Sequence, residues 1–450
     1  MSDILDDIAS AVADRNTAQA VSEVKINQLE GALNTSRLEN DELSTENEAL
    51  KTEVDELSTQ LQTLQQQLDD CMAGQPKPPS LTLGNVVFTP EDISKWTTAS
   101  PEYTRLLNSW AGRVTRDDPV PTSFPSHTSA ESESMRQAAI FVKTQSMLFL
   151  ANKEPTRKAR AFDKLDQFSL CTTWVGGGDA NLSAAWIATV VAQGAYLSGY
   201  PVDKLKGFFD MIEPRLDHPL GGNWHATFVD ARLAISSLRK DTTKFLDNID
   251  YLDFHIPQTL HHPQYDGDKI KPITSPGLWP GCKTETNVSA SMTEQHWWKQ
   301  VIRPDFKAVY KGVPFVKGVG AERIRDPGHE MMGLYSWINA CRTIKACGGV
   351  VPKHVHDRIV AHADVLGSSV LQYLQTGKFA EPVPLGKDLI PGTADDTEGG
   401  GYLMGWFGVN KYLGAESPQS VKTLLTRAEV KTAAAAGYLH VCDDPYANEK

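Results

Sequence analysis

The stretch that decides the N-terminal part of the fold runs from residue 26 to residue 68 and reads INQLEGALNTSRLENDELSTENEALKTEVDELSTQLQTLQQQL. Apolar side chains recur in it with a seven-residue period. One core position of the repeat holds Ile26, Leu33, Asn40, Asn47, Val54, Leu61 and Leu68, and the other holds Leu29, Ser36, Leu43, Leu50, Leu57 and Leu64. The pattern persists over about six heptads, and the remaining positions are mainly polar. It predicts a parallel coiled coil, because a helix with so narrow an apolar stripe cannot bury that stripe alone.

Two core positions of this repeat carry asparagine. Asn40 and Asn47 cost stability there but fix the register of the strands, which favours a parallel, in-register bundle. Asparagine at these positions leans toward two strands, whereas elongated fibre proteins are usually three-stranded. We therefore expect a homo-oligomer, a trimer in the first place and a dimer as the alternative. The competing interpretation is a single charged helix packed on its own globular domain.

The chain divides soon after this helix. The helix should end near Cys71, because Gly74 and the prolines that follow it cannot continue a helix. Those prolines form a short, semi-rigid connector. We therefore expect an oligomerisation stem at 1–72, a Pro-rich linker at 73–80 and a second domain at 81–450.

Composition excludes several classes of function. The formal net charge is -12 and no cluster of Lys and Arg is present, which argues against a nucleic-acid partner. An acidic polysaccharide remains feasible if a few cations converge in one cleft. No window of about 18 apolar residues occurs, so we expect no membrane span, and the N-terminal residues lack the pattern of a signal peptide. The six cysteines form no CxxC pair, so we expect neither a zinc ribbon nor a redox centre, and no cofactor.

The chain after residue 80 has a helical pattern. Apolar residues recur at i, i+3 and i+4, for example in 134–150, 182–197, 223–238 and 333–347. Few stretches alternate in the manner of strands. Long helices separated by Pro and Gly predict an all-α domain of stacked helical hairpins, either an open solenoid or a closed (α/α) toroid. The absence of a fixed repeat length counts against the open solenoid.

Three segments of this domain combine small, aromatic and polar residues in a way that a plain helix does not need. They are NLSAAW at 181–186, GNWH at 222–225 and RIRDPGH at 323–329, and a fourth, aromatic segment follows, GGGYLMGWFGVNKY at 399–412. In this order and at this separation the segments resemble the alginate-lyase family of polysaccharide lyases, whose members are helical toroids. The resemblance covers roughly residues 140–415. It implies the (α/α) toroid for the second domain.

The resemblance also implies a chemistry. A lyase that acts on a uronic-acid polymer removes the proton next to a carboxylate, so it needs groups that offset the developing negative charge, a base and a proton donor. By the resemblance, Asn223 and Arg325 neutralise the carboxylate. His225 is a neutraliser or base, His329 is a second base or an orienting group, and Tyr335 is a candidate acid.

The same resemblance implies further contacts with the substrate. The candidates are Trp186, Trp224, Arg323, Asp326, Tyr402 and Trp406, and Tyr402 is also a second candidate for the acid. Two departures from the family pattern concern the base. Trp224 separates Asn223 from His225, which are adjacent in the family, and His329 lies in the neighbourhood of a family tyrosine.

Simpler interpretations stay open for each of these residues. Asn223 suits the N-cap of a helix. Asp326 followed by Pro327 suits the start of the next helix, since Asp caps helices and Pro fits their first position. His225 and His329 would also suit satisfied histidines of a core.

Other polar clusters suggest metal sites but lack a ligand spacing, so we predict no metal centre. They are His261 with His262, His354 with His356, the segment EQHWW at 294–298, and Asp395, Asp396 and Glu398 as conceivable calcium ligands. Trp297 and Trp298 would serve a sugar subsite, although a Trp pair inside a helical run is more often part of a core.

The stem, the lyase-like domain and the missing secretion signal together predict a polysaccharide lyase carried on a particle, such as a bacteriophage tail fibre or spike. The expected partners are an acidic or cell-surface polysaccharide, further copies of the chain and other tail proteins of a virion. One alternative is a module that binds a glycan without catalysis. Another is a hydrolase on a similar toroid that uses two carboxylates, such as Asp230 and Asp326.

Overall fold

The computed structural model describes residues 2–73, 80–113, 118–177, 179–216, 223–267, 316–323, 325–380 and 401–435. The chain forms two compact units, Met1–Pro78 and Pro79–Lys450, and the boundary between them falls in the Pro-rich segment. The segment 294–298 and the residues Asp395, Asp396 and Glu398 lie outside the described residues.

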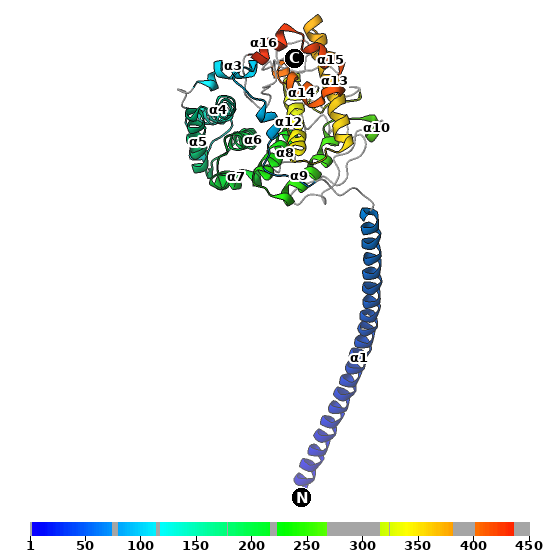
Figure 1. Cartoon of the computed structure of the whole chain (residues 1–450). Coiled ribbons are helices and arrows are strands. Elements are labelled where there is room, and N and C mark those ends of the chain that lie inside the picture. The colour runs from blue at the N-terminus through cyan, green and yellow to red at the C-terminus, as the bar shows by residue number, and fades with distance from the viewer. Residues whose placement is uncertain are drawn as a thin grey trace. The chain divides into compact units, whose positions relative to one another are not determined.

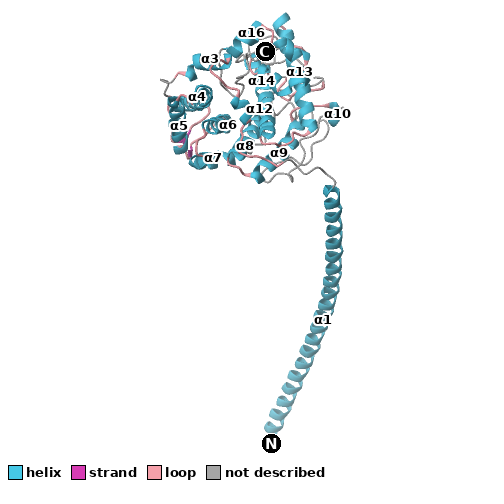
Figure 2. Ribbon diagram, viewed as in Figure 1, coloured by secondary structure: helices cyan, strands magenta, loops and turns pink. Residues whose placement is uncertain are grey.

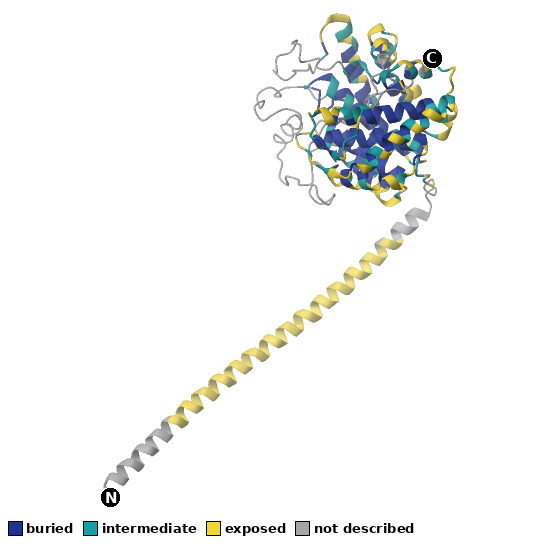
Figure 3. Cartoon of the chain, turned by 90° about the vertical axis from the view of Figure 1, so that its left-hand side faces the viewer, coloured by how far each residue is buried: buried dark blue, intermediate teal, exposed yellow. Residues whose placement is uncertain are grey.

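The first unit is built on one helix, α1 (Ser2–Ala73), which extends the heptad stretch at both ends (Figure 1). Its sequence contains no proline and a single glycine, Gly31, so nothing in it interrupts the backbone hydrogen bonds. Between Val21 and Leu61 the helix is exposed along its length (Figure 3). The large apolar side chains of the stripe in this range are exposed, and Leu29 and Leu61 expose 69% of their surface. Such a helix gains little from its own fold, because most helical stability in proteins comes from packing an apolar face.

The second unit is helical, which confirms the expectation of an all-α domain (Figure 2). Its α-helices are α2 (Pro90–Ser94), α3 (Pro101–Asn108), α4 (Ala130–Asn152), α5 (Pro155–Leu170), α6 (Ala180–Ser198), α7 (Lys206–Ile212), α8 (Asn223–Leu238), α9 (Thr242–His255), α10 (Pro263–Asp266), α12 (Pro327–Ala346), α13 (Lys353–Thr376), α14 (Trp406–Leu413), α15 (Gln419–Leu424) and α16 (Ala428–Ala435). Short 3-10 helices are η1 (Trp110–Gly112), η2 (Val202–Leu205), η3 (Glu213–Arg215), η4 (Ile256–Gln258), η7 (Gly401–Leu403) and η8 (Gly414–Glu416).

The strands of the described residues are β1 (Ser123–Phe124) and β2 (Thr173–Trp174). They pair in parallel, Ser123 with Thr173 and Phe124 with Trp174. The rings of Phe124 and Trp174 stack with centroids 4.8 Å apart. This short ladder ties the loop before α4 to the loop before α6.

Helices α4 and α6 run side by side in the same direction. Arg136 Nη1 donates to Ser183 Oγ at 3.3 Å near their N-terminal ends, and Ser146 Oγ donates to Gly194 O at 3.1 Å further along both helices. The helices approach closely because Gly194 has no side chain. A Cβ there would lie 2.5 Å from Val142 Cγ1.

Helices α8 and α12 also run in the same direction. Thr227 Oγ1 lies 3.4 Å from Ser336 Oγ, and one turn further along Asn339 Nδ2 donates to Asp230 Oδ2 at 3.4 Å. The N-terminal halves of α6 and α8 meet where Trp186 Nε1 donates to Thr227 Oγ1 at 3.3 Å. Helix N-termini of α4, α6, α8 and α12 are thus gathered on one side of the unit, while α5 packs on α4 and α9 on α8.

The core of the second unit consists of two apolar clusters. The first collects buried residues of α4 to α7, among them Phe168 and Phe208. The second collects residues of α9 and α12 to α15, among them Trp337 and Trp406. Trp224, at the start of α8, packs against both clusters. None of the described helices combines the length and the apolar composition that a membrane crossing requires.

Candidate functional site

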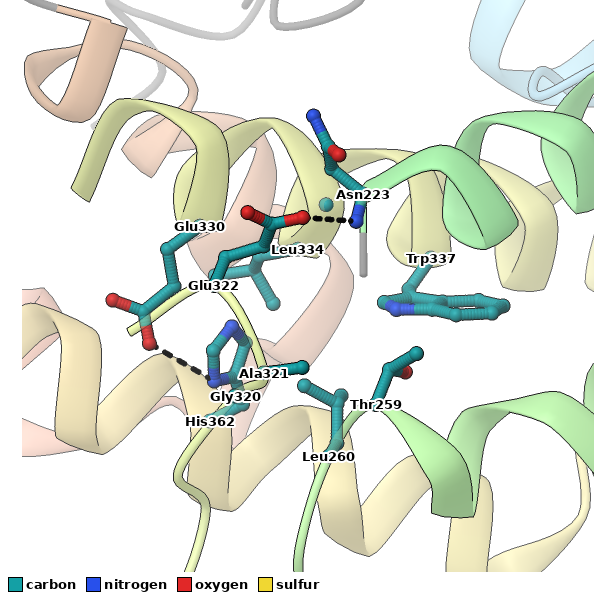
Figure 4. A pocket seen from close by; sticks show the side chains of 11 residues that line it. Asn223, Thr259, Leu260, Gly320, Ala321, Glu322, Glu330, Leu334, Trp337 and His362 are labelled. Carbon is teal, nitrogen blue, oxygen red and sulfur yellow. Dashed lines mark hydrogen bonds and ion pairs between the residues drawn. The ribbon is translucent and has the colours of Figure 1, made fainter. Parts of the chain in front are cut away.

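The turn that opens α8 and the turn that opens α12 meet in space, although about a hundred residues separate them. The backbone N–H of Asn223 donates to Glu322 Oε1 at 3.0 Å (Figure 4). The side-chain amide of Asn223 lies 3.8 Å from Met332 Sδ, and a Cβ added at Gly333 would lie 3.5 Å from Asn223 Cα. The structure therefore brings together the two segments in which the sequence predicted catalytic residues.

Asp326 organises the start of α12. It is the N-cap, with Pro327 at the first helical position, and its Oδ1 accepts the backbone N–H of His329 at 2.8 Å. Its second oxygen, Oδ2, lies 2.6 Å from His329 Nδ1. Burial raises the pKa of Asp326, but the hydrogen bonds from His329 and the charges of His329 and Arg325 outweigh it and leave that pKa below its usual value. An ionised carboxylate only accepts, so in the neutral form of the ring it selects the tautomer with the proton on Nδ1 and the lone pair on Nε2.

Arg325 lies between two carboxylates. Its Nη1 is 3.7 Å from Glu322 Oε2, and its Nε is 3.8 Å from Asp326 Oδ2. Glu322 is buried, and burial raises its pKa against the opposing effect of the Arg325 charge. Reasoning from the sequence missed Glu322. The only local signal for it was its position three residues before Arg325, on the same turn.

Exposure separates the predicted catalytic residues into two groups. Arg325 exposes 31% and His329 27% of the side chain, so both reach solvent. Asn223 exposes 1% and His225 3% of the residue. The ring of His225 packs on the buried ring of His255 with centroids 4.3 Å apart, which is the arrangement of a core histidine.

Asn223 does not act as a side-chain cap. Helix α8 begins at Asn223 itself, and its buried Oδ1 accepts no hydrogen bond from the described residues. What Asn223 contributes is a backbone N–H that holds Glu322. Its place in the site is therefore that of a positioning residue behind Arg325.

The aromatic candidates are largely buried. Tyr335 lies in the second apolar cluster, and a Cβ added at Gly408 would come within 2.8 Å of its hydroxyl. Trp406 is fully buried and donates from Nε1 to Tyr402 O at 2.8 Å. Tyr402 packs edge-on against Tyr373, and burial raises the pKa of the Tyr402 phenol. None of these three side chains presents a surface to a polymer in this conformation.

The remaining substrate candidates divide in the same way. Arg323 is fully buried, and it donates to Glu330 Oε2 at 3.1 Å and to Ala380 O at 3.0 Å. That guanidinium stabilises the fold and has no surface for a substrate. Trp186 is nearly buried and is held by Thr227, whereas Trp224 is half-buried and packs edge-on against Phe228. Of the predicted tryptophans in the described residues, Trp224 has the most accessible ring.

A narrow pocket lies beneath the two turns. It is lined by Asn223, Thr259, Leu260, Gly320, Ala321, Glu322, Glu330, Gly333, Leu334, Trp337 and His362 (Figure 4). Its free interior accommodates about one water molecule, so a sugar ring does not fit inside it. Glu330 faces His362 across it, with His362 Nδ1 3.8 Å from Glu330 Oε1. A substrate would therefore approach Arg325 and His329 from outside this pocket.

A second polar group lies at the start of α6 and was not predicted. His127 Nδ1 lies 2.6 Å from Ser183 Oγ, and Arg136 donates to the same hydroxyl at 3.3 Å. Burial and the Arg136 charge lower the pKa of His127, so the ring is held neutral. Since Trp186 lies 6.3 Å from His127, between ring centroids, and is bonded to α8, this group adjoins the turn of Asn223.

The histidines considered as metal ligands are engaged elsewhere. His354 Nε2 lies 2.5 Å from Asp253 Oδ1, and His356 pairs with Glu416. His261 lies 3.5 Å from Asp266, whose carboxylate accepts two hydrogen bonds from the buried Arg358. Within the part of the chain that the structure describes, no group of three or more metal-ligating side chains converges.

The structure changes which two carboxylates the hydrolase alternative would use. Asp230 is buried between α8 and α12, seven residues and so about 10 Å along the helix from Asn223. Burial raises its pKa well above the usual value. The carboxyl that accompanies Asp326 at the surface turn is Glu322, and the two have pKa values displaced in opposite directions.

These side chains define what the site can do chemically. No protein-family model, no curated protein and no solved structure matches this chain. The site must therefore be interpreted from its own geometry. An accessible guanidinium can hold an anion, and an accessible imidazole with a carboxylate behind it can accept a proton.

Proposed function

We propose that this protein is a polysaccharide lyase, which cleaves a uronic-acid polymer by β-elimination. The observation that carries the proposal is the pairing of His329 with Asp326, at 2.6 Å, beside the accessible Arg325. It supplies a base of fixed tautomer and a carboxylate-binding cation on one turn. The resemblance of the sequence segments to the alginate-lyase family supports the same chemistry.

In the proposed reaction, Arg325 binds the uronate carboxylate. The planar guanidinium matches the two carboxylate oxygens and stabilises the negative charge that develops as the neighbouring C–H bond breaks. The lone pair on His329 Nε2 takes that proton, and Asp326 stabilises the imidazolium that forms. The electrons left on carbon form the new double bond and expel the glycosidic oxygen, which takes a proton from solvent water, and His329 Nε2 later releases its proton to solvent.

Two further features favour an anionic substrate at this place. The N-terminal ends of α6, α8 and α12 carry partial positive charge, and the turns of this site lie at them. Glu322, held by the backbone of Asn223, fixes one side of Arg325. We assign Asn223 and Glu322 as positioning residues.

The architecture belongs to the same proposal. Parallel helices with antiparallel returns are compatible with an (α/α) toroid, and we propose that the second unit closes in that way. We propose that α1 oligomerises the chain as a coiled coil, and that the assembly is borne on a particle such as a virion tail, where other tail proteins hold it. Repeated copies would bind a surface polysaccharide through avidity.

The test is an assay for the unsaturated uronate that elimination leaves at the new non-reducing end. Full-length protein is incubated with a panel of acidic polysaccharides, and ultraviolet absorbance is followed. We expect His329→Ala and Arg325→Ala to lower the rate by at least about 100-fold. His356→Ala is the matched control, because His356 is also a helix histidine paired with a carboxylate but lies on α13. Unchanged rates in the His329 and Arg325 variants would reject the assignment.

A second candidate is a glycoside hydrolase. The observation that favours it is a pair of carboxyl groups on either side of Arg325, with Glu322 Oε2 3.7 Å and Asp326 Oδ2 3.8 Å from the guanidinium. Burial raises the pKa of Glu322 and its partners lower that of Asp326, as in a proton donor and a carboxylate base. Reducing ends released without ultraviolet absorbance would indicate hydrolysis. Binding of the polymer without any product, equal in wild type and His329→Ala, would indicate a non-catalytic binding module.

A further inference from the structure

The large apolar side chains of α1 between Val21 and Leu61 are exposed, and the sequence of the helix specifies what covers them. We infer that α1 pairs with one further copy of this chain, parallel and in register, so that the stem is a two-stranded coiled coil. This inference rests on the proposed oligomeric stem and not on the proposed chemistry. It replaces the trimer that elongated fibre proteins suggest.

The core positions favour two strands. The positions that we call d, namely Leu29, Ser36, Leu43, Leu50, Leu57 and Leu64, hold leucine with one exception and no β-branched residue. The other core positions, called a, include the β-branched Ile26 and Val54. β-Branched residues at a with leucine at d favour two strands, whereas isoleucine at d favours three or four.

Two asparagines at a positions fix the alignment. In register, Asn40 and Asn47 each face the same residue of the partner and their amides can bond to each other. A shift by one heptad would keep one pair of Asn40 with Asn47, but it would set the other Asn40 opposite Leu33 and the other Asn47 opposite Val54. Those two amides would be buried against apolar side chains, which costs free energy.

The flanking charges complement each other in this alignment. In a parallel pair, the residue before each a position faces the residue five places further along the partner. That rule pairs Lys25 with Glu30 and Glu46 with Lys51, and it produces no like-charged pair between 25 and 65. All four side chains are exposed on the described part of α1, and the structure gives them no ion pair there within their own chain.

The same charges disfavour an antiparallel pair. Glu39, Glu46 and Glu53 occupy the same flanking position in three successive heptads. Antiparallel helices bring this position opposite itself, so a centred overlap would set glutamates against glutamates. Like charges at such short range destabilise a helix pair.

The first measurement is sedimentation equilibrium of the full-length protein, with the expected mass of two chains. The second is disulfide cross-linking of Leu29→Cys, at a d position, with Asn27→Cys as the control two residues away, both with Cys71→Ser. Facing d positions lie within reach of a disulfide only when the strands are parallel and in register. A mass of one or three chains, or cross-linking of Leu29→Cys no faster than that of Asn27→Cys, would overturn the inference.

Exchanging the charges of Glu46 and Lys51 provides a second test of the alignment. Glu46→Lys turns two symmetry-related attractions into repulsions, and we expect the dissociation constant to rise roughly tenfold. Adding Lys51→Glu restores opposite charges and should recover most of that loss. A double variant that stays as weak as Glu46→Lys would reject the pairing. None of these measurements involves a polysaccharide, so their outcome is independent of the proposed lyase activity.

Discussion

Asp326 performs two tasks with its two oxygens, and substitution can separate them. Asp326→Ala removes the N-cap of α12 and the partner of the His329 ring together. Loss of the cap costs about 1 kcal/mol and loss of a hydrogen bond to an ionised group about 1.5–3 kcal/mol, so we expect a destabilisation of about 3 kcal/mol. Asp326→Asn keeps a capping oxygen, because Asn and Asp cap equally well, and should therefore cost about 1 kcal/mol less than Asp326→Ala.

The pH dependence of the unfolding free energy provides an independent check on the role of the Asp326 carboxylate. The pKa of Asp326 is lower in the folded protein than its usual value, so its contribution is present above the unfolded pKa and is lost as the pH falls through the folded pKa. The difference in unfolding free energy between wild type and Asp326→Asn should therefore be largest near neutral pH. It should shrink as the solution is acidified below about pH 4.

The assay is urea unfolding followed by tryptophan fluorescence. All ten tryptophans lie beyond residue 79, and the stem contains no aromatic residue, so the signal reports the second unit alone. An Asp326→Asn variant as unstable as Asp326→Ala would show that the capping oxygen does not contribute. A difference between wild type and Asp326→Asn that does not depend on pH would show that the ionised carboxylate does not contribute.

Two further substitutions test the packing of the second unit. Gly318→Ala should destabilise it by about 2 kcal/mol more than Gly377→Ala in the same urea assay. Both glycines have positive φ, but a Cβ at Gly318 would lie 2.2 Å from Ala361 O, whereas a Cβ at Gly377 would meet nothing within 4 Å. Equal losses would contradict the clash with the Ala361 carbonyl as the cause. Asp230→Asn should stabilise the protein near neutral pH, because burial raises the pKa of Asp230 and makes its ionised form costly in the fold. The gain in unfolding free energy should grow by about 1.4 kcal/mol per pH unit above pH 4, as long as Asp230 stays protonated in the fold. A stabilisation that is the same at every pH would contradict that cause.

The sequence predicted where the helices lie better than it predicted which side chains of the site reach solvent. The heptads predicted a helix over 26–68, and α1 extends beyond both ends of that stretch into residues that include neither proline nor glycine. Arg323 and Arg325 look equivalent in the sequence, two residues apart. The fold buries Arg323 against Glu330 and leaves Arg325 at the surface. Arg323 also donates to the carbonyl of Ala380, 57 residues away, and that contact cannot be predicted from the local sequence.

The site shows the same division between local and distant causes. The cap at Asp326 could be predicted from Asp followed by Pro, and it coexists with the bond to His329 because a carboxylate has two oxygens. Glu322 could not be found, since its partner is the backbone of Asn223, 99 residues away. Tyr335 is buried by contacts with Gly405 and Gly408, which no spacing around Tyr335 reveals.

The polar contacts between α8 and α12 have a consequence for how exactly the two turns of the site are positioned. Thr227 with Ser336 and Asp230 with Asn339 are spaced by one helical turn, so the two helices fit only at one axial offset. A slip of one turn, about 5.4 Å, would strand each polar group against carbon. Apolar replacements there would be expected to tolerate such a slip, at the expense of the fixed separation between the start of α8 and His329.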